Sequence, residues 1–343
     1  MAFVLVDAKR REQPDDECPS REVRDAAYRD HSTSSNLPQA ETTKAAAASI
    51  REAAQAGAQL IVFPEAFIPG YLAWIWRLRP GSDMGLSERL HSLLLANSVR
   101  IAGDDLAPLS EAARQSKVTV VCGVDERDTE FSRSTIYNSL VVIGPDGTLL
   151  NRHRKVMPTN PERMVWGFGD ASGLKAIDTP RGRIGTLICW ENYMPLARCA
   201  LYAQGVEIYI APTYDAGQRW VATMQHIARE GGCWALGSGC AFQVRHISDA
   251  IPGKAELYPD ADEWVNPGDS VVIAPGGKIV AGPLHNELGI LYADIDLESI
   301  GTAKRSLDTV GHCSRPDLFL LHVNAGPLWP VEFGALPGKS PAS

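Results

Sequence analysis

The sequence predicts an α/β protein with a four-layer α-β-β-α sandwich made of two duplicated sheet units. Short apolar, largely β-branched runs alternate with helical segments, which is typical of strands buried on both faces. The same order of strands and helices occurs twice, about 130 to 150 residues apart, a period too long for a solenoid. Two sheets that each carry helices on one face can bury their bare faces against each other.

The first unit begins with an Ala-rich segment, residues 42–56, which predicts a helix. Residues 60–63 (LIVF) predict a buried strand, and residues 87–116 are mostly helical in pattern. A second buried strand is expected over residues 118–124, and the turn signature GPDG at residues 144–147 predicts a hairpin after it.

The second unit repeats this order. Residues 271–277 (VVIAPGG) match residues 141–147 (VVIGPDG) almost letter for letter, and the strand ending at Pro212 parallels the strand ending at Pro64. The expected elements are strands at residues 183–188, 207–212, 233–239 and 271–273, and helices at residues 194–204 and around 222–230.

Composition excludes several classes of protein. The 343 residues carry 33 Lys and Arg against 41 Asp and Glu, a net charge of −8, with no basic block, so nucleic acid and anionic membranes are not expected partners. No apolar run approaches the ~20 residues that span a bilayer, and no signal peptide is expected at the start, which predicts a cytoplasmic protein. The seven cysteines show no C-x-x-C spacing, so neither a disulfide framework nor a metal site is expected.

Three groups able to do chemistry follow predicted strands. Glu65 follows the first buried strand, Lys155 follows the hairpin, and Cys189 stands at a strand-to-helix turn, where backbone N–H groups favour a thiolate. Ligands collect at such strand ends in α/β folds. A carboxylate can deprotonate a thiol and a lysine can stabilise developing charge. Each residue also has an ordinary interpretation: a buried core thiol, a paired acid and a solvated charge.

The segments around these residues resemble the signature segments of the nitrilase superfamily. They are residues 63–71 (FPEAFIPGY), 154–159 (RKVMPT) and 189–198 (CWENYMPLAR), and the last resembles the nitrilase branch rather than the amidase or carbamoylase branches. The resemblance covers about residues 40–325. It implies the duplicated sandwich fold, a glutamate base at Glu65, a lysine at Lys155, a cysteine nucleophile at Cys189 and a second glutamate at Glu162.

The resemblance also implies the reaction. An organic nitrile is hydrolysed to the carboxylic acid and ammonia through a thioimidate and then a thioester on Cys189, with no metal or organic cofactor. Glu191 belongs to the signature either as a reactive acid or as a structural one. Substrate-lining residues are expected among Tyr71, Trp166, Trp190 and Met194, with ordinary core packing as the alternative interpretation.

The two ends of the chain are less well defined. A carbon-nitrogen hydrolase domain is expected at residues 36–296, and residues 1–35 are unassigned because the family's first strand would fall on residues 23–30, which carry four charges. Either residues 2–6 replace this strand or this edge is poorly ordered. After the second sheet ends near Asp296, the tail 297–343 is too short for a domain.

The tail nevertheless contains an apolar stretch, LFLL at residues 318–321 followed by Val323. Such a stretch is expected to cover a neighbouring surface, and the resemblance implies that the tail crosses a subunit interface in a homodimer or a larger, spiral oligomer.

Three other functions remain open at this point. An amidase or carbamoylase would use the same Cys-Glu-Lys set on an amide, and a cyanide-degrading nitrilase would act on cyanide. A catalytically silent scaffold would have no reason to keep Glu65, Lys155, Glu162 and Cys189 together.

Overall fold

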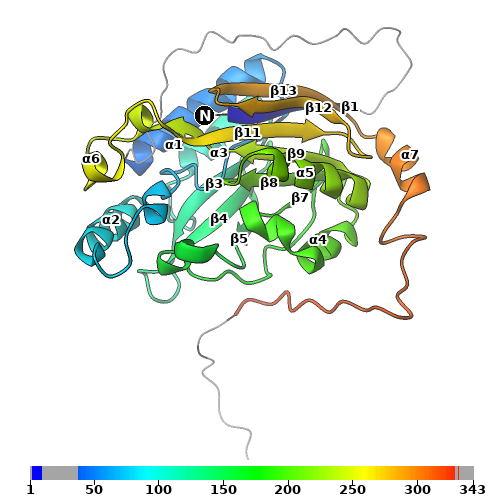
Figure 1. The fold of residues 1–343 in the computed structure, drawn as a ribbon. Coiled ribbons are helices and arrows are strands. Elements are labelled where there is room, and N and C mark those ends of the chain that lie inside the picture. The colour runs from blue at the N-terminus through cyan, green and yellow to red at the C-terminus, as the bar shows by residue number, and fades with distance from the viewer. Residues whose placement is uncertain (1, 10–37, 329–330, 332–343) are drawn as a thin grey trace, which may run out of the picture.

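The computed structural model describes residues 2–9, 38–328 and 331, and it confirms the predicted sandwich. Two sheets are stacked face to face, and helices cover the outer face of each (Figure 1).

The first sheet has six strands in the order β13-β1-β2-β3-β4-β5. Strands β2 and β3 are parallel, and β3, β4 and β5 form an antiparallel meander. Its outer face is covered by helices α1 (Gln39–Gln55) and α3 (Ala107–Ser116). The strands are β1 (Ala2–Lys9), β2 (Leu60–Val62), β3 (Thr119–Arg127), β4 (Ile136–Ile143), β5 (Leu149–Arg154) and β13 (Gly289–Asp296).

The second sheet has the order β10-β11-β9-β8-β7-β6, with β12 paired to β11. Strands β7, β8 and β9 are parallel, and helices α4 (Pro195–Tyr202) and α5 (Gln218–Gly231) cover its outer face. The strands are β6 (Ile177–Thr179), β7 (Gly182–Thr186), β8 (Ile208–Thr213), β9 (Trp234–Gly239), β10 (Ala241–Gln243), β11 (Trp264–Ile273) and β12 (Ile279–His285).

The central core lies between the two sheets. Leu60 and Val121 from the first sheet meet Ile208, Leu236 and Val272 from the second, and each is fully buried. Burial of such side chains stabilises the fold by about 1.5–3 kcal/mol each. The β-branched runs that predicted these strands are therefore the residues that hold the two sheets together.

The remaining elements lie around the sandwich. A short 3-10 helix, η1 (Ala73–Trp76), leads into α2 (Met84–Asn97), and α6 (Lys254–Leu257) lies on the same side of the molecule (Figure 1). Three further 3-10 turns are η2 (Asn160–Met164), η3 (Cys189–Tyr193) and η4 (Val244–His246), and the last helix is α7 (Ser299–Ser306). Residues 307–328 follow α7 along the outside of the sandwich (Figure 1), and the backbone N–H of Leu328 donates to Oδ2 of Asp170 at 3.3 Å.

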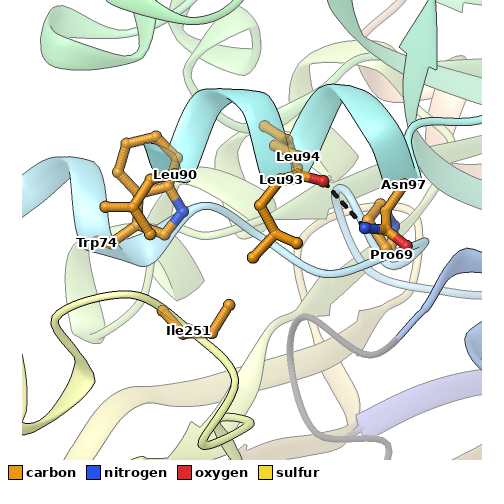
Figure 2. A pocket seen from close by; sticks show the side chains of 7 residues that line it. All are labelled: Pro69, Trp74, Leu90, Leu93, Leu94, Asn97 and Ile251. Atoms are coloured by element: carbon orange, nitrogen blue, oxygen red, sulfur yellow. Dashed lines mark hydrogen bonds between the residues drawn. The ribbon is translucent and has the colours of Figure 1, made fainter. Parts of the chain in front are cut away.

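A small apolar cavity lies under α2. Its volume is about 10 Å³, which is room for about one water. Figure 2 shows the side chains around it, and none of them is a predicted catalytic residue. They are Pro69, Trp74, Leu90, Leu93, Leu94, Asn97 and Ile251.

Two expectations need correction. The strand that ends at Asp296, β13, belongs to the first sheet, because it pairs in parallel with β1. The helical stretch predicted at residues 87–116 is two helices, α2 and α3, separated at residues 98–106.

The N-terminal strand follows one of the two expected alternatives. Strand β1, which includes residues 2–6, lies between β13 and β2, while residues 23–30 lie outside the described residues. The domain limits at residues 36–296 and 297–343 stay predictions.

Candidate functional site

The predicted site residues meet at one edge of the sandwich. Glu65 follows β2, Lys155 follows β5 and Cys189 follows β7. The two sheets therefore contribute to one site, as strand ends do in α/β folds generally.

Glu65, Lys155 and Glu162 form a buried ionic cluster. The Nζ atom of Lys155 donates to Oε1 of Glu65 and to Oε2 of Glu162, at 2.8 Å in each case. None of the three side chains is exposed by more than 1%. Charges buried in this way are tolerated when they are paired and hydrogen-bonded.

Glu65 is held by two further donors. The Nδ2 atom of Asn138 donates to Oε1 at 2.7 Å, and the backbone N–H of Tyr214 donates to Oε2 at 2.6 Å. The backbone around Glu65 passes very close to β3 at Gly123. A Cβ atom at Gly123 would lie 2.3 Å from the carbonyl oxygen of Pro64 and 2.9 Å from the carbonyl carbon of Glu65, so only glycine fits there.

Glu162 is oriented by its own helix and by a tyrosine. It is the third residue of η2, and its Oε2 atom accepts the backbone N–H of Thr159, the residue before η2, at 2.7 Å. The hydroxyl of Tyr71 donates to Oε1 at 2.5 Å. Together with Lys155, these donors fix the carboxylate on both oxygens.

Cys189 begins the 3-10 turn η3 with a positive φ of 51°, a conformation that costs a non-glycine residue about 1–2 kcal/mol. The side chain is buried, and the backbone carbonyl oxygen of Cys189 accepts from Nδ2 of Asn192 at 2.7 Å. Burial and the nearby Glu65 charge raise the pKa of the thiol above its usual value, although Lys155 opposes them. The sequence predicted that the turn favours a thiolate, whereas burial acts on this thiol in the opposite direction.

Lys155 and Glu65 carry the charges that act on this thiol. Burial works to lower the pKa of Lys155, but Glu65, Cys189 and Glu162 outweigh it and raise the pKa, so the ammonium stays charged. Burial raises the pKa of Glu65 above its usual value, against the opposing effect of Lys155. A carboxyl with a raised pKa is a better proton acceptor once ionised.

The sequence left two roles open for Glu191, reactive or structural, and its hydrogen-bond partners favour the structural one. Its Oε2 atom accepts the backbone N–H of Ile188 at 2.7 Å and lies 3.0 Å from Nε2 of His153, and its Oε1 atom accepts the N–H of Val156 at 2.6 Å. Burial acts to raise the pKa of Glu191, but His153 and these backbone donors bring it below the usual value. Glu191 thus links the cysteine turn to the lysine segment.

The four candidate pocket residues fall into two pairs. Tyr71 and Trp166 are buried beside the cluster, with ring centroids 5.7 Å apart, and Nζ of Lys155 lies 5.7 Å from the Trp166 ring. Trp190, which follows Cys189 in η3, and Met194, the residue after η3, are 46% and 38% exposed. The first pair therefore lies beside the ionic cluster and the second at the surface of the cysteine turn, while contact of either pair with a substrate stays a prediction.

Sequence reasoning missed several polar residues of the site. Asn138 and Asp125 face each other across β4 and β3, and Asp125 accepts the indole N–H of Trp166 at 2.7 Å. Both are polar residues inside otherwise apolar strands, which was an available signal. Tyr214 follows β8. The internal repeat gave a signal for this region, because Pro212 near the end of β8 corresponds to Pro64, and the segment after Pro64 begins with Glu65.

Two further properties of the described residues bear on function. None of the described helices is long and apolar enough to cross a membrane. The part of the chain that the structure describes with its side chains contains no cluster of three or more His, Cys, Asp or Glu arranged to hold a metal ion.

Comparison with known proteins gives the family. The carbon-nitrogen hydrolase family matches residues 26–305. Nitrilase 2 of Arabidopsis thaliana is 41% identical over 296 residues, which cover 83% of this chain and 84% of the relative. An aliphatic nitrilase of Sinorhizobium fredii is 40% identical over 279 residues, covering 81% of this chain and 88% of the relative.

A solved structure supports the fold independently. The crystal structure of a carbon-nitrogen hydrolase from Helicobacter pylori superposes with a TM-score of 0.61 at 20% identity, covering 93% of this chain and 96% of that one. Because the family match and the 40–41% identical relatives each extend over most of the chain, this protein belongs to the carbon-nitrogen hydrolase family, and to the nitrilases within it.

Proposed function

We propose that this protein hydrolyses an organic nitrile to the carboxylic acid and ammonia, with Cys189 as the nucleophile. The observation that carries the proposal is the buried cluster in which Nζ of Lys155 binds Glu65 and Glu162, together with the buried Cys189, which follows strand β7. A thiol, a base and a fixed ammonium are the groups that covalent attack on a carbon-nitrogen bond requires.

The first half of the reaction forms a thioimidate. Glu65 accepts the thiol proton as Sγ of Cys189 adds to the nitrile carbon, and that proton then passes to the nitrile nitrogen, which gives the neutral thioimidate and restores the Glu65 carboxylate. Two of the three N–H bonds of Lys155 go to Glu65 and Glu162, and the third can point at the nitrile nitrogen as it becomes negative. The backbone N–H of Trp190, next to the nucleophile, supplies a second donor.

The second half releases both products. Water adds to the thioimidate, ammonia leaves, and a thioester remains on Cys189. A second water, activated by Glu65, releases the acid and restores the thiol, so one nitrile and two waters give one acid and one ammonia. Glu162 keeps Lys155 in place throughout.

A panel of aliphatic, arylaliphatic and aromatic nitriles, each assayed beside its amide for ammonia release, tests the proposal. We expect turnover of nitriles and a mass increase on Cys189 that corresponds to the acyl adduct. Cys189→Ala should abolish turnover and keep the fold, and Cys313→Ala, which removes an exposed thiol, should behave as wild type.

Two results would contradict the proposal. Hydrolysis of the amides without the nitriles would make the protein an amidase. More than a few per cent of wild-type turnover in Cys189→Ala would exclude the covalent mechanism.

We also propose that the chain acts in the cytoplasm as a dimer or a larger oligomer. The tail supports this, because Leu318, Phe319 and Leu320 are 61%, 80% and 72% exposed in a single chain, and such apolar residues are expected to be covered by a second copy. Light scattering should give at least a dimer at micromolar concentration, and cell fractionation should recover the activity in the cytosol. A stable monomer would refute the assembly.

A further inference from the structure

Residues 214–217 form the loop after β8, and two of them in succession contact the site. The backbone N–H of Tyr214 donates to Oε2 of Glu65 at 2.6 Å. The next residue, Asp215, contacts the turn that carries the nucleophile, and neither the sequence motifs nor the reaction steps account for it.

One oxygen of Asp215 holds both ends of that turn. Its Oδ2 atom accepts the indole N–H of Trp190 at 3.1 Å and the hydroxyl of Tyr193 at 2.9 Å. Trp190 is the second residue of η3 and Tyr193 is the last. A single carboxylate oxygen thus spans the turn along its outer side, where both aromatic side chains are more than 40% exposed.

Hydrogen bonds within its own loop hold Asp215 in place. Its backbone N–H donates to Oγ1 of Thr213 at 2.7 Å, and its Oδ1 atom accepts the N–H of Ala216 at 2.9 Å. The end of the loop is anchored to the second sheet, because the N–H of Gly217 donates to Asp269 at 2.7 Å. The carboxylate is therefore a rigid acceptor rather than a mobile surface group.

The turn needs such an anchor, because Cys189 has a φ of 51°, and strained conformations persist only when the surroundings fix them. The inner side of the turn is held by Glu191 and Asn192. The outer side is held by Asp215, whose neighbour Tyr214 holds Glu65. Displacement of a reacting group by about 1 Å can cost about a hundredfold in rate.

We propose that Asp215 is a positioning residue that fixes the nucleophile turn relative to Glu65 by binding Trp190 and Tyr193. The proposal rests on the proposed function, in which Cys189 transfers its proton to Glu65 and the backbone N–H of Trp190 faces the reacting nitrogen. Asp215 binds the indole N–H of Trp190 and does not take part in either step.

The test measures kcat per active site, with sites counted by mass after alkylation of Cys189 with iodoacetamide. Asp215→Ala should lower kcat about tenfold to a hundredfold with little change in KM, and should slow alkylation of Cys189 as well. Asp215→Asn keeps an acceptor oxygen and should restore most of the rate. Asp178→Ala, which removes an exposed acid that binds Arg183, is the matched control and should match wild type.

Tyr193→Phe removes one of the two donors and shows whether they act through Asp215. It should lower kcat several-fold in the wild-type chain and cause no further loss in Asp215→Ala, since residues that share one interaction are not additive. Because it deletes a single hydroxyl from a half-exposed ring, this variant decides the matter even if Asp215→Ala does not fold.

A purely structural role would give a different result. A lower melting temperature and fewer titratable sites, with kcat per site unchanged, would overturn the proposal, and so would wild-type kinetics of a folded Tyr193→Phe. Alkylation of Cys189 is measured without a nitrile, so a wild-type protein that hydrolyses no nitrile would contradict the proposed function while the alkylation rates still test Asp215.

Discussion

The Nζ atom of Lys155 lies 2.8 Å from Oε2 of Glu162, and the two side chains are 0% and 1% exposed. In such a buried pair the loss of one partner leaves an uncompensated charge, whereas replacement of both partners is often tolerated. The pair therefore offers a way to separate what the site contributes to stability from what it contributes to catalysis.

Lys155→Ala should lower turnover by about 10² or more and destabilise the fold by about 3–5 kcal/mol, because Glu65 and Glu162 lose their shared cation. The double variant Lys155→Met/Glu162→Gln should regain much of that stability and none of the activity. Thermal unfolding and ammonia release measure the two effects. Turnover that returns together with stability would show that Lys155 only supports the fold.

Glu65→Gln should lower turnover by about 10² or more, since the amide cannot accept the thiol proton. In the wild type, kcat/KM should fall on the acid side with an apparent pKa above that of an ordinary glutamate, because burial raises the pKa of Glu65. The groups facing Glu65 are Lys155, Glu162, Asn138 and Cys189. The fall of kcat/KM at acid pH therefore reports the titration of Glu65 together with the ionisable groups coupled to it. This fall should disappear in Glu65→Gln, and Glu111→Gln on the surface of α3 is the control.

Asp125→Asn should stabilise the protein increasingly as pH rises from 4 to 8. Burial raises the pKa of Asp125 well above its usual value, against the hydrogen bond from Trp166. The wild-type protein therefore gains stability at low pH, where this carboxyl is neutral in both states. The gain is complete below about pH 4 and is lost as pH rises through the folded-state pKa. It amounts to about 1.4 kcal/mol for each unit by which the pKa of Asp125 in the folded protein exceeds its pKa in the unfolded protein.

The asparagine keeps the acceptor for Trp166 and never has to ionise. Melting temperatures of both proteins across this pH range measure the effect. A difference between them that stays constant with pH would mean that Asp125 does not remain neutral in the folded protein.

Trp166→Ala should shift relative kcat/KM toward bulkier nitriles by about tenfold or more, because the ring lies beside Lys155 and limits the space near the nitrile carbon. Trp166→Phe keeps a ring but loses the hydrogen bond to Asp125, so it should reduce stability with little change in preference. A three-substrate rate ratio and the melting temperature distinguish the two effects. An unchanged ratio with a lower melting temperature in Trp166→Ala would assign Trp166 to the core alone.

Gly123→Ala should lower stability by about 1–3 kcal/mol and kcat by tenfold or more, because the added methyl overlaps the Pro64 carbonyl and pushes the backbone of Glu65 away. Gly85 in α2 has open space around its Cβ position, so Gly85→Ala should leave activity unchanged. Unfolding by denaturant and turnover per titrated Cys189 check both variants. A stable, fully active Gly123→Ala would show that the segment at Glu65 is not held by this close approach.

The sequence alone predicted the layers and the duplication, and its resemblance to the nitrilase superfamily pointed to the four residues Glu65, Lys155, Glu162 and Cys189. These are local or repeated signals: apolar strands must be buried on both faces, and a motif is read in consecutive residues. It also placed the hairpin at residues 144–147, because turn chemistry is local.

Only the tertiary structure decided the features that join distant segments. It placed β13 in the first sheet, gave Glu191 its backbone partners, and brought Tyr214 to Glu65 and Asp215 to Trp190. It also buried Cys189, and burial and the Glu65 charge raise the pKa of its thiol. Strand order, burial and hydrogen bonds between residues far apart in the chain depend on how the two sheets pack, and no local pattern in the sequence encodes that packing.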